Sequence, residues 1–308
     1  MGYGLYLTAA TLFGFNGTVA KTILATGISA ARLSQLRVTL AFLVLLIVVL
    51  LRQPSALKIR TWSEARLLAM YGIAGVMLTQ FLYFFAIHRI PVGITLIIEF
   101  TAPFIVAVWF RVTRNERISR RVVSGMLIAF AGLVLIAQVW EGFTLDAIGT
   151  ISAWGAAASL AVFYVMGERA NLELAHRDAV SITMWGFAGA ALVWAIVLPW
   201  WSFPWSQISG TSEPWSSAQW RLPVPLLVAS MVLLGTVITF WLSIMSMRHI
   251  TAAQASSFGM TEPVVASIIA WLLIGESLST WQVIGIGVAG VGILYAERSR
   301  MRPVELVE

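Results

Sequence analysis

The sequence predicts an all-α membrane protein of ten transmembrane helices, arranged as two inverted five-helix repeats. Its 308 residues are 59% hydrophobic and only 11% charged, and the mean hydropathy is +0.87. A soluble domain carries roughly a quarter of its residues as charges, so this chain has too few to cover a water-facing surface. The two other observations behind the prediction are the length of the apolar runs and a phrase that occurs twice.

Apolar runs follow one another along the whole chain, and each is long enough to cross a bilayer as a helix, which takes about 20 residues. Their continuous apolar character excludes the alternating strands of a membrane β-barrel. The first run lacks a preceding basic stretch, so we interpret it as a span and not as a secretory signal. The predicted spans are Gly4–Leu24, Leu33–Leu51, Ala65–Ile87, Val92–Phe110, Val122–Val139, Ile148–Gly167, Ala179–Trp200, Val224–Met247, Thr251–Ile274 and Trp281–Ala296.

The basic residues lie mostly on one side of these spans. Of 20 Lys and Arg residues, 15 fall on the side of the N-terminus and four, Lys21, Arg32, Arg89 and Arg221, on the other. Cytoplasmic loops carry such an excess, which predicts that both ends of the chain are cytoplasmic. Basic loops at an anionic leaflet also explain the high isoelectric point without nucleic acid. Arg37 is left inside a span, where we expect its side chain to snorkel.

The repeated phrase divides the chain into halves of residues 1–147 and 148–308. Residues Thr101–Ser119 and Thr261–Ser279 share Thr, Pro, Glu and Ser at a constant offset of 160. The same offset pairs Gly75 with Gly235 and Thr79 with Thr239. Because each half holds an odd number of spans, equivalent helices point in opposite directions. Secondary transporters are built this way, with the substrate between the halves near mid-bilayer.

Small residues mark the last helix of each half. Gly125, Ala129 and Gly132 lie on one helical face, and Gly285, Ala289 and Gly292 repeat the pattern at the same offset. Small side chains let helix backbones approach closely in lipid. We therefore expect the fifth and tenth helices to meet each other or to flank the halves, away from the substrate.

Two carboxyl groups lie inside predicted spans. Placing a charged carboxylate at the centre of a membrane helix costs about 2.5–3.5 kcal/mol, so Glu99 and Glu262 need a reason to be there. One interpretation is a proton relay or a partner for a substrate ammonium group. The other is structural: the carboxyls satisfy backbone groups freed where Pro103 and Pro263 kink the fourth and ninth helices.

Further polar and aromatic residues fall in the same spans. The predicted substrate contacts are Asn16, Thr79, Tyr83, Glu99, Trp154, Trp185, Ser243 and Gln254. For each polar residue the alternative is a hydrogen bond between helices, and for each tryptophan a position facing lipid or core. The chain has no cysteine and no H-E-x-x-H or phosphate-loop motif. We therefore expect no enzymatic activity, no cofactor and no metal.

The arrangement resembles the EamA branch of the drug/metabolite transporter superfamily. The resemblance covers nearly the whole chain and is carried by "TEP" in the ninth helix and "GESLSTWQVIGIGVAGVGIL" at the tenth. The first half departs from the pattern, with Asn115 where the family has Gly before Glu116, and Ala102 where the second half has Glu262. The resemblance implies a central cavity and a bacterial inner-membrane exporter of small metabolites. Within the branch, the aromatic-rich spans look most like the aromatic and neutral amino-acid exporters.

The sequence thus predicts a secondary transporter that exports amino acids or similar metabolites by alternating access. Its partners are a small-molecule substrate and the lipid bilayer, without nucleic acid, and the chain is expected to be a monomer or a weak homodimer. The alternatives are transport or flipping of another substrate, such as a nucleotide-sugar or a lipid-linked molecule, an intramembrane enzyme, or a passive channel.

Overall fold

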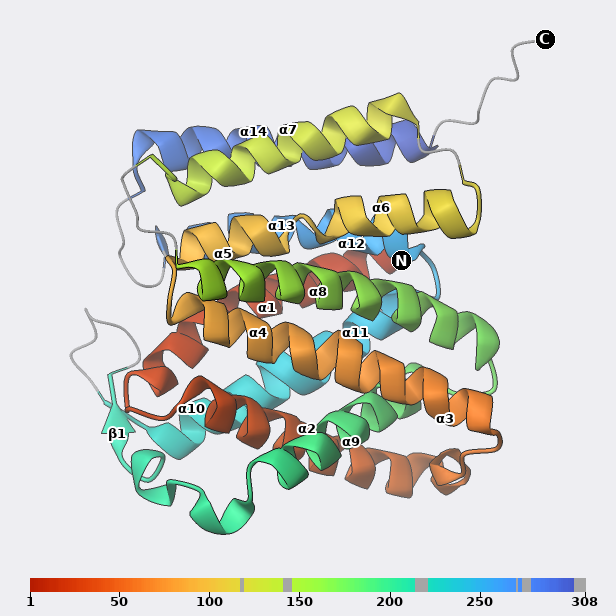
Figure 1. Cartoon of the computed structure of the whole chain (residues 1–308), viewed down its shortest axis with the longest axis vertical. Helices are drawn as coiled ribbons and strands as arrows, with labels where there is room; N and C mark the ends of the chain where they lie inside the picture. Colours follow the sequence, from red (N-terminus) through yellow and green to blue (C-terminus); the bar gives the residue numbers. More distant parts are fainter. Residues whose placement is uncertain (117–118, 141–145, 214–220, 270, 273–277, 302–308) are drawn as a thin grey trace.

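A computed structural model describes residues 1–116, 119–140, 146–213, 221–269, 271–272 and 278–301. These residues form helices, apart from one two-stranded antiparallel sheet in the longest loop (Figure 1). The elements of the first half are α1 Gly2–Leu24, α2 Ala30–Arg52, η1 Pro54–Leu57, α3 Trp62–Ala69, η2 Met70–Met77, α4 Leu78–Ile87, α5 Val92–Glu99, α6 Ala102–Thr113 and α7 Arg120–Ala137. Those of the second half are α8 Ala147–Glu173, α9 Ala179–Val197, η3 Trp200–Ser202, η4 Trp205–Gln207, β1 Thr211–Ser212, β2 Leu222–Pro223, α10 Val224–Val232, η5 Leu233–Ile238, α11 Thr239–Ser246, α12 Ala252–Gly259, α13 Thr261–Ile269 and α14 Thr280–Met301.

Eight helical segments in the described part of the chain are long and apolar enough to cross a membrane. They coincide with eight of the predicted spans, and three of them join neighbouring elements into one rod, such as α3, η2 and α4. The other two predicted spans correspond to α1 and to α12 with α13, which are helical but are not among these eight. The predicted end of the ninth span, Ile274, lies outside the described residues.

Polar caps set where several helices begin. Ser29, Asp146 and Asp178 each accept a hydrogen bond from a backbone N–H in the first turn of α2, α8 and α9. Thr251 and Gln254 cap α12 reciprocally, each side chain bonding the other's backbone. These side chains satisfy donors that a helix leaves free at its start. They place the ends of the apolar helices at the boundaries that the sequence predicts.

The helices at the fourth and ninth predicted spans are each broken at the same relative position. Between α5 and α6 the break falls at Phe100 and Thr101, and between α12 and α13 it falls at Met260. Phe100 and Met260 are 160 positions apart in the sequence. Pro103 follows within the first turn of α6, where its missing N–H leaves the carbonyl of Glu99 without a helical donor. Pro263 stands in the same place in α13.

The third and eighth spans share another irregularity, a π-helical stretch in the middle of an otherwise α-helical rod. The first is η2 and the second is η5. In η5, Thr236 donates to the carbonyl of Met231, five residues earlier, at 2.9 Å. Such insertions are rare and tend to occur at functional sites. Here the two stretches lie at corresponding places in the two halves.

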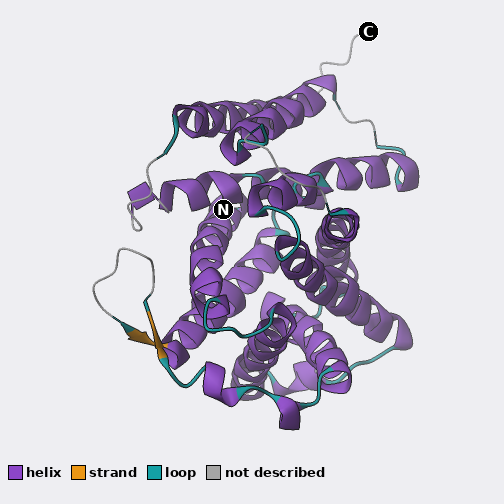
Figure 2. Cartoon of the chain, turned by 60° about the vertical axis from the view of Figure 1, so that its left-hand side comes forward, coloured by secondary structure: helices purple, strands orange, loops and turns teal. Residues whose placement is uncertain are grey.

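The helices α7 and α14 pack against each other along one edge of the molecule, as Figures 1 and 2 show. A Cβ atom on Gly132 would lie 2.3 Å from the backbone nitrogen of Ala289, and one on Gly292 would lie 2.2 Å from that of Ala129. The small-residue faces therefore bring the two backbones together. Of the two arrangements that the sequence allowed, the contact between the fifth and tenth predicted helices is the one observed.

The contacts between α7 and α14 are reciprocal: corresponding residues of the two halves contact corresponding partners. Gly125 faces Ala296, while Gly285, its counterpart at the offset of 160, faces Ile136, the counterpart of Ala296. Such reciprocity is what a two-fold axis produces in an interface between identical surfaces. Because the sequence rises along α7 as it falls along α14, the two helices are antiparallel.

Candidate substrate cavity

A cavity of about 400 Å³ opens in the bundle between the two halves. Helices of both halves contribute to its wall: α1, α2, η2, α4 and α5 from the first, and α8, α11 and α13 from the second. Most of the lining is apolar or aromatic, and a few polar groups project from it. The polar and charged lining residues are Tyr6, Asn16, Arg37, Thr79, Gln80, Tyr83, Glu99, Tyr164 and Glu262.

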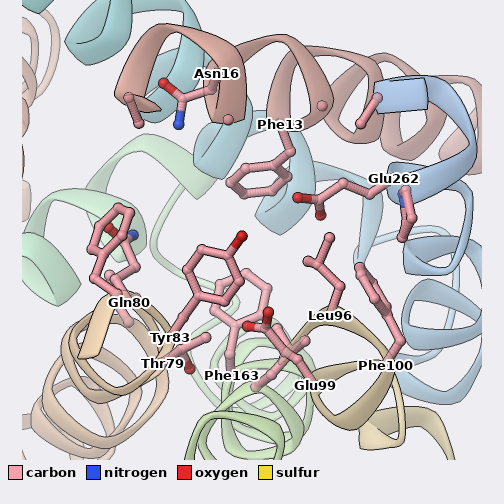
Figure 3. A pocket seen from close by; sticks show the side chains of 18 of the residues that line it. Phe13, Asn16, Thr79, Gln80, Tyr83, Leu96, Glu99, Phe100, Phe163 and Glu262 are labelled. Atoms are coloured by element: carbon pink, nitrogen blue, oxygen red, sulfur yellow. The ribbon is translucent and has the colours of Figure 1, made fainter. Parts of the chain in front are cut away.

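The two carboxyl groups face the cavity from opposite walls. Glu99 is the last residue of α5, and Glu262 is in the first turn of α13. Figure 3 shows both carboxylates pointing into the space, with the Tyr83 side chain beside Glu99. Each break in a spanning helix therefore delivers one acidic side chain to the cavity. Glu99 is buried, with 8% of its surface exposed, whereas Glu262 is partly exposed.

Four of the eight predicted substrate contacts line this cavity: Asn16, Thr79, Tyr83 and Glu99. Asn16 comes from α1 and lies across the cavity from Tyr83 and Thr79 of α4 (Figure 3). The Oδ1 atom of Asn16 is buried and has no hydrogen-bond partner among the described residues. The hydroxyl of Thr79 donates to the carbonyl of Gly75 at 2.6 Å.

The other four predicted contacts lie elsewhere. Trp154 is on the outer face of α8, half exposed. Trp185 donates its indole N–H to the carbonyl of Ala56 at 3.1 Å. Ser243 is fully buried and donates to the carbonyl of Thr239 at 2.9 Å. Gln254 belongs to the cap of α12 and donates to the Tyr3 hydroxyl at 2.6 Å.

Among the described residues, Arg37 is the cationic side chain that lines the cavity, and it does not snorkel as the sequence predicts. It is buried, with 4% of its surface exposed. Its Nε donates to the hydroxyl of Thr236 at 2.6 Å, and its Nη2 donates to the carbonyl of Gly235 at 3.0 Å. Both acceptors belong to η5, so the π-helical stretch holds the guanidinium inside the bundle.

Two buried tyrosines of the lining, one from each half, contact each other, and we interpret their contact as the closed end of the cavity. The hydroxyls of Tyr6 in α1 and Tyr164 in α8 lie 2.6 Å apart, and both side chains are buried. A Cβ on Gly259 would lie 2.4 Å from the Tyr164 hydroxyl, so the end of α12 also presses on this contact. The pairing of Tyr164 with Tyr6 depends on how the helices are arranged, and no local sequence pattern predicts it.

Beyond these tyrosines, polar contacts tie the helix ends together. Arg114 donates to Glu168 Oε1 at 2.8 Å, and Tyr3 donates to Glu297 Oε2 at 3.0 Å while accepting from Gln254. The hydrogen bond to Glu168 is the main cause of a pKa of Arg114 above its ordinary value, with a smaller contribution from Glu116. Arg114 therefore stays charged at any physiological pH.

Within the described residues, no group of three or more His, Asp or Glu side chains is placed to hold a metal ion. The described lining offers two carboxylates, a guanidinium, hydroxyls and two carboxamides among aromatic side chains. Such a site can bind a small polar molecule by charge and hydrogen bonding, with its apolar part against the rings.

Comparison with known proteins agrees with this architecture. A model of the EamA-like transporter family matches residues 1–138 and again residues 147–296. The uncharacterised inner membrane transporter YicL of Salmonella typhimurium is 22% identical, over 89% of this chain and 87% of that protein. The threonine/homoserine exporter RhtA of Escherichia coli K12 is 26% identical, over 75% of this chain and 70% of the exporter. A crystal structure of another protein superposes with a TM-score of 0.74 at 18% identity, over 98% of this chain and 99% of that one, and shows the fold alone.

Proposed function

Because the chain belongs to the EamA-like transporter family, whose model matches it twice, we propose that it exports amino acids or similar small metabolites across a bacterial inner membrane. The observation that carries the proposal is the cavity between the halves, which holds acidic and basic groups in an aromatic lining. The named relatives are an inner membrane transporter and an exporter of threonine and homoserine. Their names support a small-metabolite exporter. The substrate of this chain has to be inferred from the residues of its own cavity.

We infer that the bundle has ten spans, with α1 and the broken rod of α12 and α13 added to the eight apolar segments. Both additions pack within the bundle, α1 against α11 and α13. An even number of spans puts both termini on one side, which the basic loops identify as the cytoplasm. The reciprocal contacts of α7 and α14 support an axis perpendicular to these helices, and hence in the membrane plane. The repeats, residues 1–147 and 148–308, would then be inverted.

The charges in the cavity favour a zwitterionic substrate. We propose that Glu99 and Glu262 bind an ammonium group and that Arg37 attracts a carboxylate. Asn16, Thr79 and Tyr83 would supply hydrogen bonds, and Phe13, Phe163 and Phe240 would surround the apolar part. Neutral and aromatic amino acids have these groups. A charge-assisted hydrogen bond is roughly twice as strong as a neutral one, so the charged ends should dominate recognition.

The two ends of the cavity differ in a way that supports alternating access. At one end α6 packs against α12. Their counterparts at the offset of 160 are α13 and α5, and these two helices instead both line the cavity. In the proposed topology, the closed end is cytoplasmic and the open end faces outward. A rocking motion that exchanged these two relationships would open the cavity to the cytoplasm.

Counterflow into proteoliposomes tests this function. Vesicles loaded with an unlabelled neutral amino acid should accumulate the labelled one transiently, because a carrier exchanges substrate faster than it leaks. An imposed pH gradient that changes the flux would establish proton coupling, and an unchanged flux would exclude it. Non-saturating flux without counterflow would indicate a channel. No flux of any amino acid would overturn the proposed substrate class.

A further inference from the structure

Glu168 has a buried carboxylate that makes no contact with the cavity, and both of its oxygens are engaged. The residue lies on α8 with 5% of its surface exposed. Its Oε1 accepts from Arg114 Nη1 at 2.8 Å, just beyond the end of α6. Its Oε2 accepts the backbone N–H of Ala252, the first residue of α12, at 2.6 Å. One carboxylate therefore holds the ends of two helices to a third.

This contact joins the two halves at the closed end of the cavity. Arg114 belongs to the first half, while Glu168 and Ala252 belong to the second. One turn earlier on the same face of α8, Tyr164 meets Tyr6 of the first half at 2.6 Å. The carboxylate thus lies beyond the tyrosine contact that closes the cavity.

The other end of the cavity has no equivalent closure among the described residues. Since α6 and α12 correspond to α13 and α5, symmetry would place α5 against α13 if that end were shut. Instead α5 and α13 both line the cavity, and Glu99 and Glu262 point into it (Figure 3). The packing of α6 on α12 is therefore specific to the conformation described here. Glu168 makes its hydrogen bonds at this packed end, which would have to separate in the opposite conformation.

We propose that Glu168 is a gating residue for transport: its carboxylate keeps the cytoplasmic end shut by binding Arg114 and the start of α12, and it releases Arg114 when that end opens. This inference rests on the transport function and topology proposed above. The two partners differ in what they lose on opening. The Arg114 side chain is 38% exposed and that of Glu168 is 7% exposed. Water readily replaces Glu168 as the partner of the partly exposed Arg114. The buried Glu168 instead loses Arg114, its cationic partner among the described residues, and its carboxylate becomes hydrated as the helices separate.

Cavity accessibility tests the gate without reference to any substrate. The chain has no cysteine, so a single reporter can be introduced as Gly17→Cys. Gly17 lines the cavity, and no described atom outside its own stretch of helix lies within 4 Å of a Cβ placed there. Labelling by a membrane-impermeant maleimide would be measured in right-side-out and inside-out vesicles. The reporter would be combined with Glu168→Gln or Arg114→Gln, and with Glu116→Gln as the matched control.

Glu168→Gln keeps an oxygen for the Ala252 N–H and loses the charge that holds Arg114, while Arg114→Gln removes the partner alone. Each should raise labelling from the cytoplasmic face by about tenfold and lower it from the other, because a charged hydrogen bond is lost from one state only. Glu116 also pairs with Arg114, at 3.7 Å, but its side chain is 54% exposed. Glu116→Gln should therefore leave both rates unchanged.

Cytoplasmic labelling that stays at the parent rate in the Arg114→Gln protein would overturn the gate, as would an equal rise in the Glu116→Gln control. Monodisperse elution in detergent establishes that each variant is folded. Arg114→Gln replaces Glu168→Gln if the latter does not fold. The Gly17→Cys protein without a gate substitution should be labelled from the outer face. Labelling of that protein from the cytoplasmic face would contradict the proposed topology. Absent amino-acid flux with the expected labelling shift would contradict the proposed substrate and leave the gate standing.

Discussion

The two acidic residues of the cavity do not occupy corresponding positions in the two repeats, so the site is asymmetric. At the offset of 160, the counterpart of Glu99 is Gly259 and that of Glu262 is Ala102. Glu99 ends α5 at the negative end of its helix dipole, and Glu262 starts α13 at the positive end of its own. The two halves therefore present different acidic groups to the same substrate, and each carboxylate can be tested alone.

Replacing Glu262 tests the proposed ammonium contact. The change Glu262→Gln keeps the shape and removes the charge, which should weaken a charge-assisted hydrogen bond by about 1.5–3 kcal/mol. We expect the half-saturating concentration in the counterflow assay to rise by roughly 10–100-fold. The control is Glu213→Gln, since Glu213 pairs with Arg221 in an exposed loop at 3.5 Å. An unchanged half-saturating concentration in the Glu262 variant would remove this residue from the site.

A second residue-scale prediction concerns the approach of α1 to η5. A Cβ on Gly235 would lie 2.1 Å from Asn16 Oδ1, so this glycine makes room for the carboxamide. Gly235→Ala should cost about 1–3 kcal/mol of stability through overpacking and should push Asn16 into the cavity. Gly17→Ala, a change at a cavity-lining glycine with free space, should be neutral or stabilising. Thermal unfolding in detergent measures both, and equal melting temperatures for the two variants would contradict the close approach.

Residue type alone predicted part of this site. Asn16, Tyr83 and Glu99 stand out because a polar group in an apolar span needs a partner, and they line the cavity. Which face of a helix points inward depends on its neighbours, so the same reasoning also selected Trp154, which lies on the outer surface. Glu168 was overlooked since it lies near the end of a span, where a charge is unremarkable until its partners are known.

At the scale of elements, the spacing of small residues was the most informative signal. Gly125, Ala129 and Gly132 fall on one face because four and three residues make whole turns of an α-helix. The same spacing in α14 supplies the partner, so the pairing of the two helices follows from the sequence. The π-helical stretches η2 and η5 do not follow, because no local pattern distinguishes Met70–Met77 or Leu233–Ile238 from an ordinary apolar helix.

The pairing of α7 with α14 yields a stability prediction. A methyl group on Gly132 would meet the backbone of Ala289 at 2.3 Å, and a backbone cannot move aside unless the helices separate. Gly132→Ala should therefore destabilise the protein by about 1–3 kcal/mol. Gly290→Ala is the matched control on α14, since nothing lies within 4 Å of a Cβ there. Melting temperatures in detergent compare the two, and a Gly132 variant as stable as the control would show that close packing is not needed.

At the scale of the whole molecule, the repeat explains both the symmetry and its violation. The breaks at Phe100 and Met260 and the two π-helical stretches occupy corresponding positions. The packing around the cavity does not correspond, because α6 meets α12 while α5 and α13 line opposite walls. The sequence predicted the two halves, since equivalent elements share residues. It did not indicate which end would be closed, because both arrangements use the same surfaces.

The same reasoning specifies contacts of the opposite conformation. Val106 and Ser256 are buried on α6 and α12 at the closed end. Their counterparts at the offset of 160 are Ala266 and Leu96, which line the cavity and are partly exposed. If the halves exchange roles during transport, α5 should close on α13 and bring Leu96 towards Ala266.

A double variant, Leu96→Cys with Ala266→Cys, can capture that conformation, and the absence of native cysteines leaves no competing thiols. Oxidation in membranes should cross-link the pair, and the rate should rise about tenfold when the Glu168→Gln change favours the state open to the cytoplasm. Counterflow should stop after oxidation and return after reduction, because a carrier held in one state cannot cycle. Either single cysteine variant serves as the control and should keep its activity under oxidant. Full transport with the cross-link formed would mean that substrate crosses without closure of α5 on α13, and alternating access by exchange of the two halves would be wrong.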